Sequence, residues 1–164
     1  MPPDPCTEAM PDSKPMLRSI LAVLALSGFT LGAAQAQDRP QPRLETIELT
    51  AGMHLIRAEV AQTPQQQATG MMFRTSMGAN EGMLFVNAQA GVRCFWMRNT
   101  LIPLSIAFIA DDGAIVNIAE MQPRSDESHC SAKPVRFALE MQKGWFAKRG
   151  LQAGTKLRGL PFRP

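Results

Sequence analysis

The chain has 164 residues, of which 45% are hydrophobic and 19% are charged. This composition excludes a disordered or fibrous protein and leaves enough residues for one domain with a substantial core. The formal net charge is only +3, and the basic residues are scattered along the chain rather than gathered into a stripe. A nucleic-acid partner is therefore not expected, because binding to a phosphate backbone requires clustered positive charge.

An apolar segment near the N-terminus predicts export. Residues 20–32 follow Arg18 and carry no charge, and the segment is shorter than the roughly 20 residues that a membrane-spanning helix requires. It is followed by Ala34-Gln35-Ala36, a small-x-small pattern that signal peptidase accepts. We interpret residues 1–36 as an N-terminal extension and secretory signal peptide, with cleavage after Ala36. The mature protein is then periplasmic or secreted and keeps no stable membrane span.

The first residues of the chain differ from the basic start of a typical signal peptide. Several prolines and acids precede Met16, whereas signal peptides begin with a positively charged region. Translation from Met16 gives a better leader than translation from Met1, and Met10 is the other candidate start.

The mature chain contains two cysteines, because Cys6 lies before the expected cleavage point. An isolated pair of cysteines in an oxidising compartment forms a disulfide by default. We therefore expect a bridge between Cys94 and Cys130, which would close a loop of about 37 residues and stabilise the fold by roughly 4 kcal/mol. The alternative is a pair of buried free thiols.

The rest of the chain predicts a small, mostly β domain. Residues 37–43 are polar, include two prolines and are interpreted as a linker, and residues 44–164 as a single domain. Thr63 and Pro64 mark the start of a short helix that Gly70 ends or bends. Seven or eight short strands with one or two short helices indicate a compact β-sandwich or barrel-like domain. Strands are expected at residues 44–49, 53–60, 83–86, 92–97, 104–110, 114–121, 135–141 and 156–160, and a second helical segment at residues 143–149.

Two local patterns predict more detail. Asp112-Gly113 predicts a tight hairpin turn between the strands on either side of it. Side chains alternate between the two faces of a strand, so the expected strand at residues 92–97 places Phe95 and Met97 on one face. The opposite face then carries Cys94, Trp96 and Arg98.

Three sequence blocks follow one another through the mature chain. The first block is GMMFR at residues 70–74, followed by EGMLF at residues 81–85. The second block is FWMRNTLIPL at residues 95–104, with FI and GAIV soon after it. The third block is VRFALE at residues 135–140, with the glycines that follow. Together they resemble the domain of unknown function 192 family over about residues 45–160. The resemblance implies a compact, mostly β domain that is often exported and has no established activity.

One position departs from the family pattern. Relatives usually carry aspartate after the Pro-Leu pair, where this chain has Ser105. Any chemistry or metal binding that depends on that acid in the relatives is therefore absent here.

The candidate binding site is the polar pair Asn99-Thr100, which interrupts the apolar residues of the second block. Asn99 and Thr100 can offer an amide and a hydroxyl group to a polar ligand, or they can hold a turn by bonding to nearby backbone. Trp96 and Trp145 can stack on a ligand or pack against the core. The expected binding residues are Trp96, Arg98, Asn99, Thr100, Glu81 and Glu140.

We expect these residues to form a non-catalytic module that binds an unknown small molecule or an envelope protein and acts as a monomer. The sequence shows no arrangement of nucleophile and base and no spacing typical of metal ligands, so neither a cofactor nor a metal is expected. One alternative is an enzyme that uses Glu81 or Glu140 as a general base and Arg98 as an anion clamp. That alternative requires an acid and Arg98 to share one pocket.

The second alternative is copper binding. Thioether groups bind Cu(I), and methionine is abundant in the mature chain. The same side chains can instead fill the core, because methionine is flexible and apolar. The methionines after the expected cleavage point are Met53, Met71, Met72, Met77, Met83, Met97, Met121 and Met141.

Overall fold

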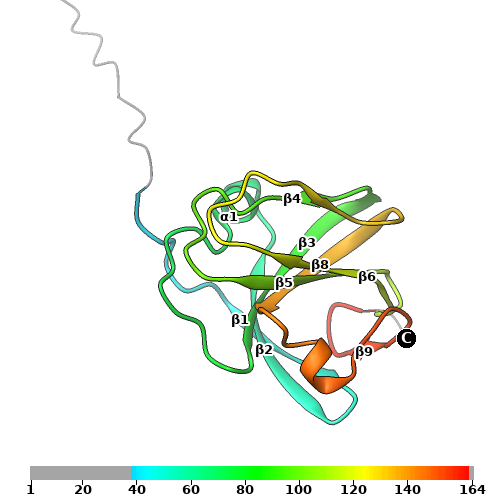
Figure 1. Cartoon of the computed structure of the whole chain (residues 1–164). Coiled ribbons are helices and arrows are strands. Elements are labelled where there is room, and N and C mark those ends of the chain that lie inside the picture. The colour runs from blue at the N-terminus through cyan, green and yellow to red at the C-terminus, as the bar shows by residue number, and fades with distance from the viewer. Residues whose placement is uncertain (1–37, 163–164) are drawn as a thin grey trace, which may run out of the picture. The chain divides into compact units, whose positions relative to one another are not determined.

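The computed structural model describes residues 38–162, which form the β domain shown in Figure 1. The expected leader, its cleavage site, the candidate translation starts and Cys6 lie outside the described residues.

A curled seven-stranded sheet is the centre of the domain (Figure 1). Its strands lie in the order β6-β5-β8-β3-β2-β1-β9. Every neighbouring pair is antiparallel except β2 and β3, which are parallel and are connected through α1. The strands are β1 (Thr46–Ala51), β2 (His54–Ala61), β3 (Glu81–Gly91), β5 (Leu104–Ile109), β6 (Ile115–Met121), β8 (Val135–Gln142) and β9 (Leu157–Arg158).

A second, two-stranded sheet joins β4 (Cys94–Phe95) to β7 (His129–Cys130). With α1 (Pro64–Thr69) and the 3-10 turn η1 (Ala147–Arg149), these elements confirm the expected mostly β, barrel-like fold with one or two short helices. The described residues contain nine strands, one more than expected. The additional strand is β7, which lies in a polar segment without apolar alternation and pairs because β4 lies beside it.

The start and end of α1 follow directly from local sequence. The Thr63 hydroxyl oxygen accepts a hydrogen bond from the Gln66 backbone N–H at 3.2 Å, and the Gln66 side-chain oxygen accepts one from the Thr63 N–H at 3.0 Å. This reciprocal pair is a capping box, and Pro64 occupies the first helical position. Gly70 ends the helix with a φ of 48°, where a Cβ atom would also lie 3.2 Å from the Phe85 ring. The helix is thereby fixed close to β3.

Two hairpins are present within residues 38–162, and one of them is the hairpin expected at Asp112-Gly113. β1 pairs with β2 from Thr46 opposite Glu59 to Ala51 opposite His54. The turn between β5 and β6 uses Gly113 at a φ of 81°, a left-handed conformation that glycine adopts without strain.

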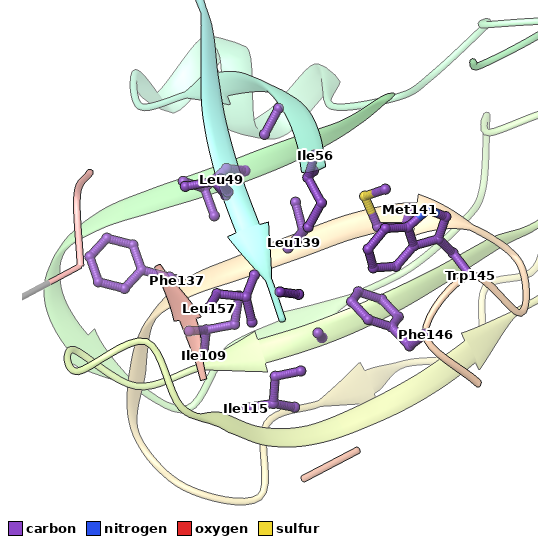
Figure 2. Packing of buried hydrophobic residues seen from close by; sticks show 14 of the residues in the cluster. Leu49, Ile56, Ile109, Ile115, Phe137, Leu139, Met141, Trp145, Phe146 and Leu157 are labelled. Atoms are coloured by element: carbon purple, nitrogen blue, oxygen red, sulfur yellow. The ribbon is translucent and has the colours of Figure 1, made fainter. Parts of the chain in front are cut away.

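The first hydrophobic core lies on one face of the sheet and is shown in Figure 2. Trp145 and Phe146 pack edge to face within it, with ring centroids 5.2 Å apart. Trp145 is only 2% exposed, whereas Trp96 is 49% exposed. Trp145 therefore belongs to the core, and Trp96 is the tryptophan available to a ligand.

The second hydrophobic core covers the opposite face of the sheet and is rich in methionine. Flexible thioether side chains suit the irregular space between a sheet and the loops that cover it. Phe95 packs against this core, whereas Trp96 and Arg98 are exposed, so the expected alternation is confirmed. The methionines of this core are Met71, Met77, Met83, Met97 and Met121.

Candidate functional site

A cavity of about 500 Å³ lies beside the second core. Its walls are α1 with the turn that follows it, the end of β3, and the segment around β4, and Figure 1 shows α1 and β4 close together. The lining residues that are buried, and therefore form the inner part of the cavity, are Thr69, Gly70, Met71, Phe85, Thr100 and Glu140.

β8 directs the side chain of Glu140 toward this cavity. Neighbouring residues on β8 alternate between the two cores, with Met141 in the first and Ala138 in the second, so Glu140 shares the face of Ala138. Its neighbours across the sheet are Met83 on β3 and Ile106 on β5, both members of the second core. On the side of the sheet, the carboxyl group of Glu140 is therefore surrounded by apolar side chains.

The carboxyl group of Glu140 is buried without a protein partner. The residue is 4% exposed, and its Oε2 atom has no hydrogen bond to any other residue within 38–162. Burial raises the pKa of Glu140 to about 8, because an apolar environment disfavours the charged form. At neutral pH the group is mainly an uncharged acid that can donate one hydrogen bond. An unpartnered polar group is costly to bury, and in a cavity this combination makes Glu140 the candidate functional residue.

Other polar groups in the cavity wall already have partners. The Thr69 hydroxyl donates to the Gln65 carbonyl oxygen at 3.0 Å. The Gln67 amide donates to the Val86 carbonyl oxygen at 2.7 Å. These bonds hold the wall in place. Two lining residues keep a buried side-chain atom without a hydrogen bond to any other residue within 38–162, namely Glu140 at Oε2 and Arg93 at Nε.

The mouth of the cavity combines an exposed indole with positive charge. The Arg98 guanidinium lies 4.2 Å from the centroid of the Trp96 ring, and its Nε atom donates to Asp126 at 2.8 Å. The guanidinium of Arg93, a lining residue, donates to the carbonyl oxygen of Gln89. Arg98 therefore flanks Trp96 without lining the cavity itself.

Asn99 shapes the cavity indirectly. Its carbonyl oxygen accepts a hydrogen bond from the Phe73 N–H at 2.9 Å, and its amide nitrogen lies 3.8 Å from the Met72 sulfur. Phe73 has a φ of 62°, a left-handed conformation that is rare outside glycine. The backbone of Asn99 thus holds the turn after α1, and its side chain contacts Met72 and does not line the cavity.

Glu81 lies outside the cavity. Its carboxylate accepts a hydrogen bond from the Gly78 N–H at 3.1 Å and pairs with Arg43 at 3.3 Å. The Gly78 hydrogen bond and the Arg43 charge lower the pKa of Glu81. Glu81 and Glu140 therefore lie in different environments and do not form an acid–base pair.

Glu59 is a structural acid that was not singled out from the sequence. Arg74 and Arg43 each bond to it at 2.7 Å, and the Leu44 N–H donates to it at 2.9 Å. Burial raises the pKa of Glu59, but these hydrogen bonds outweigh the burial and the net effect is a lowered pKa. The network fastens the segment after α1, which carries the cavity wall, to β2.

The structure contains the expected disulfide between Cys94 and Cys130, with an S–S distance of 2.06 Å. The two cysteines lie opposite each other in the β4–β7 ladder. Cys94 also lines the cavity. The covalent bond therefore fixes one wall of the candidate site.

The structure brings together half of the expected binding residues. Trp96, Thr100 and Glu140 line the cavity, whereas Glu81, Arg98 and Asn99 do not. The signal that could have identified Glu140 is an acid inside the apolar strand at 135–141, since a buried acid is rare. Lining residues that were not singled out for the site include Gln67, Thr69, Met71, Met72, Phe85, Arg93 and Phe95.

Two further findings concern the described part of the chain, residues 38–162. No group of three or more His, Cys, Asp or Glu side chains is placed there to hold a metal ion. No helix in this range has the length and apolar character needed to cross a membrane.

Comparison with known proteins identifies the family. A family model described as DUF192, "Uncharacterized ACR", matches residues 46–159. The chain belongs to the DUF192 family. No curated protein matches the sequence significantly.

Two solved structures are similar to this DUF192 protein. One is a "putative transcription regulator" from Sinorhizobium meliloti 1021, with 32% identity and a TM-score of 0.69 over 73% of this chain and 97% of that chain. The other is a protein of unknown function from Novosphingobium aromaticivorans DSM 12444, with 36% identity and a TM-score of 0.68 over 76% of this chain and 94% of that chain.

The hydrogen bonds of Ser105 connect β5 to β6 and to the segment after β8. The hydroxyl group of Ser105 donates to Glu120 at 2.7 Å and accepts from the Gly144 N–H at 2.8 Å. The other carboxylate oxygen of Glu120 lies 3.2 Å from the same N–H. The Gly144 N–H is thus bonded by the hydroxyl group of Ser105 and by the carboxylate of Glu120.

Proposed function

We propose that this DUF192 protein is an exported, non-catalytic module that binds a small molecule in the cavity above Glu140. The observation that carries this proposal is a buried carboxyl group without a partner at the inner end of the cavity. The cavity volume of about 500 Å³ falls in the range of small-molecule sites. Trp96 at the mouth adds an apolar surface on which part of a ligand can lie.

An enzyme is the second candidate, because a carboxyl group with a pKa of about 8 suits general acid–base chemistry near neutral pH. The proposed partners for such chemistry lie elsewhere. Arg98 pairs with Asp126, and Glu81 pairs with Arg43. Binding requires only the groups that the cavity contains, and for that reason we favour it.

Copper binding has weaker support. Met71 and Met72 line the cavity, but Met141 packs in the other core and Met53 is 92% exposed. A Cu(I) site needs several thioethers around one point. Silver(I), a redox-inert substitute for Cu(I), belongs in the ligand screen as a direct test.

The proposed location is the periplasm or the extracellular space, and it is supported by the leader pattern and the disulfide. Mass spectrometry of the protein from a cell-envelope fraction tests it. We expect an N-terminus at Gln37 and no alkylation of Cys94 or Cys130 before reduction. An intact leader together with two alkylated thiols would overturn the assignment.

A thermal-shift screen tests the binding site. A ligand that binds the native protein raises the melting temperature. The screen compares the wild type with Glu140→Gln, which keeps the shape of the side chain, and with Glu81→Gln, which makes the same change outside the cavity. We expect compounds that stabilise the wild type and Glu81→Gln more than Glu140→Gln. Compounds that stabilise all three equally would place binding elsewhere and contradict the proposal.

A further inference from the structure

We propose that the ligand is an organic monocation, a primary amine attached to an aromatic or other apolar body, whose ammonium group binds the Glu140 carboxylate. This inference rests on the proposed binding function and specifies the chemistry of its ligand. It follows from the polarity, the charges and the side chains of the cavity.

No side chain of the described residues supplies a cation to Glu140. The residues opposite Glu140 on the adjacent strands are Met83 and Ile106, and neither side chain is ionisable. Among the residues that line the cavity, Arg93 is the other charged one. The Arg93 guanidinium donates to the Gln89 carbonyl oxygen and keeps its positive charge, but within residues 38–162 it forms no ion pair with Glu140. A direct ionic partner for an ionised Glu140 therefore has to come with the ligand.

The hydrogen-bonding groups at the inner end favour an ammonium group over a neutral acceptor. The neutral acid can offer a single O–H donor to a carbonyl or ether oxygen. An ammonium group has three donors, and it can bond to Glu140 and to the hydroxyl of Thr100, a buried residue that lines the same cavity. A charge-assisted bond of this kind is stronger than a neutral one.

The walls define the rest of the ligand. The rings of Phe85 and Phe95 meet edge to face with centroids 4.8 Å apart, and Met71 lies in the same lining. Aromatic and thioether side chains pack well against a ring, and aromatic faces also attract cations. Arg93 disfavours a second positive charge on the ligand, which restricts the proposal to monocations.

Isothermal titration calorimetry on the full protein tests the inference with two matched probe pairs, 2-phenylethylamine against 2-phenylethanol and tryptamine against tryptophol. Each amine differs from its alcohol only in the polar group. Titrations at pH 6, 7 and 8, in buffers with different heats of ionisation, report the affinity and the protons exchanged.

We expect the amines to bind more tightly than the alcohols and to release close to one proton at pH 7, because Glu140 has to ionise. The amine affinity should rise by up to about tenfold per pH unit up to pH 8, where Glu140 is half ionised without ligand. Glu140→Gln should weaken amine binding by at least about tenfold and leave alcohol binding nearly unchanged, while Glu81→Gln should change neither.

The possible failures separate the two proposals. If thermal-shift ligands depend on Glu140 but are neutral, or if the alcohols bind as tightly as the amines without proton release, the amine inference fails and the binding function stands. Absence of amine binding also overturns the inference. If amines bind the wild type and Glu140→Gln equally well, both the ligand class and the assigned site are wrong.

Discussion

The guanidinium group of Arg74 donates to both carboxylate oxygens of Glu59 through hydrogen bonds of 2.7 Å. Both residues are buried, with exposures of 8% and 4%. Arg74 follows the turn after α1, and Glu59 lies on β2. The pair therefore connects the segment that lines the cavity to the central sheet.

Replacement of Arg74 should destabilise the protein strongly. Arg74→Met leaves a buried carboxylate with only the partly exposed Arg43 as a charged partner, and breaking a buried pair typically costs about 3–5 kcal/mol. Urea unfolding measures the loss. Arg43→Met is the matched control, because the Arg43 side chain is 64% exposed and should contribute less than about 1 kcal/mol. Equal losses in the two variants would contradict the assigned role of Arg74.

Glu140 should make the stability of the free protein depend on pH. Its pKa rises from the ordinary 4.5 to about 8 on folding, so between these values the native state holds a proton that the unfolded state has lost. Stability relative to Glu140→Gln should therefore be highest below pH 4.5 and fall by up to about 1.4 kcal/mol per unit as pH rises. The difference should become constant above pH 8.

Urea unfolding of both proteins from pH 5 to 9 measures this dependence. Glu59 acts in the opposite direction, since its pKa is lowered and its contribution is lost as pH falls below its ordinary value. That contribution is common to wild type and Glu140→Gln and cancels in the comparison. A flat difference across the range would show that Glu140 ionises freely in the native state.

Replacement of Ser105 by aspartate should destabilise the protein. Ser105→Asp places a second carboxylate next to Glu120, where the serine hydroxyl now donates a hydrogen bond at 2.7 Å. Repulsion between the two charges should lower the stability by about 1–3 kcal/mol. Adding Glu120→Gln should recover most of the loss, as measured by a double-mutant cycle in urea. Independent, additive effects would contradict the proposed coupling.

Removal of the disulfide should loosen the cavity wall. Replacement of Cys94 and Cys130 by serine should reduce stability by about 2–5 kcal/mol. Thermal unfolding with and without a reducing agent measures the same effect in the wild type. The double variant should be insensitive to the reductant, and equal sensitivity in both proteins would attribute the effect to another group.

The sequence predicted the elements that depend on neighbouring residues. The start and end of α1 are determined by Thr63, Pro64 and Gly70, which lie close together in the sequence. The turn between β5 and β6 is likewise determined by a local residue, Gly113. β7 has no such local signal. It forms because Cys130 lies opposite Cys94, a residue distant in the sequence.

The candidate site was only partly predictable for a similar reason. Glu140 was visible as an acid within an apolar strand, and Thr100 as part of a polar break. The position of Arg98 depends on Asp126, and that of Glu81 on Arg43, far away in the sequence. Contacts of this range are set by the sheet order and do not follow from local patterns.

The contrast between Trp96 and Trp145 gives the molecule two intrinsic optical reporters. The sequence contains two tryptophans and no tyrosine, so near-ultraviolet emission arises almost entirely from these indoles. Water around Trp96 shifts its emission to the red, whereas the emission of Trp145 is blue-shifted inside the core. Occupation of the cavity should alter the red component alone, and loss of the fold should alter both, which allows the two events to be followed in one unlabelled sample.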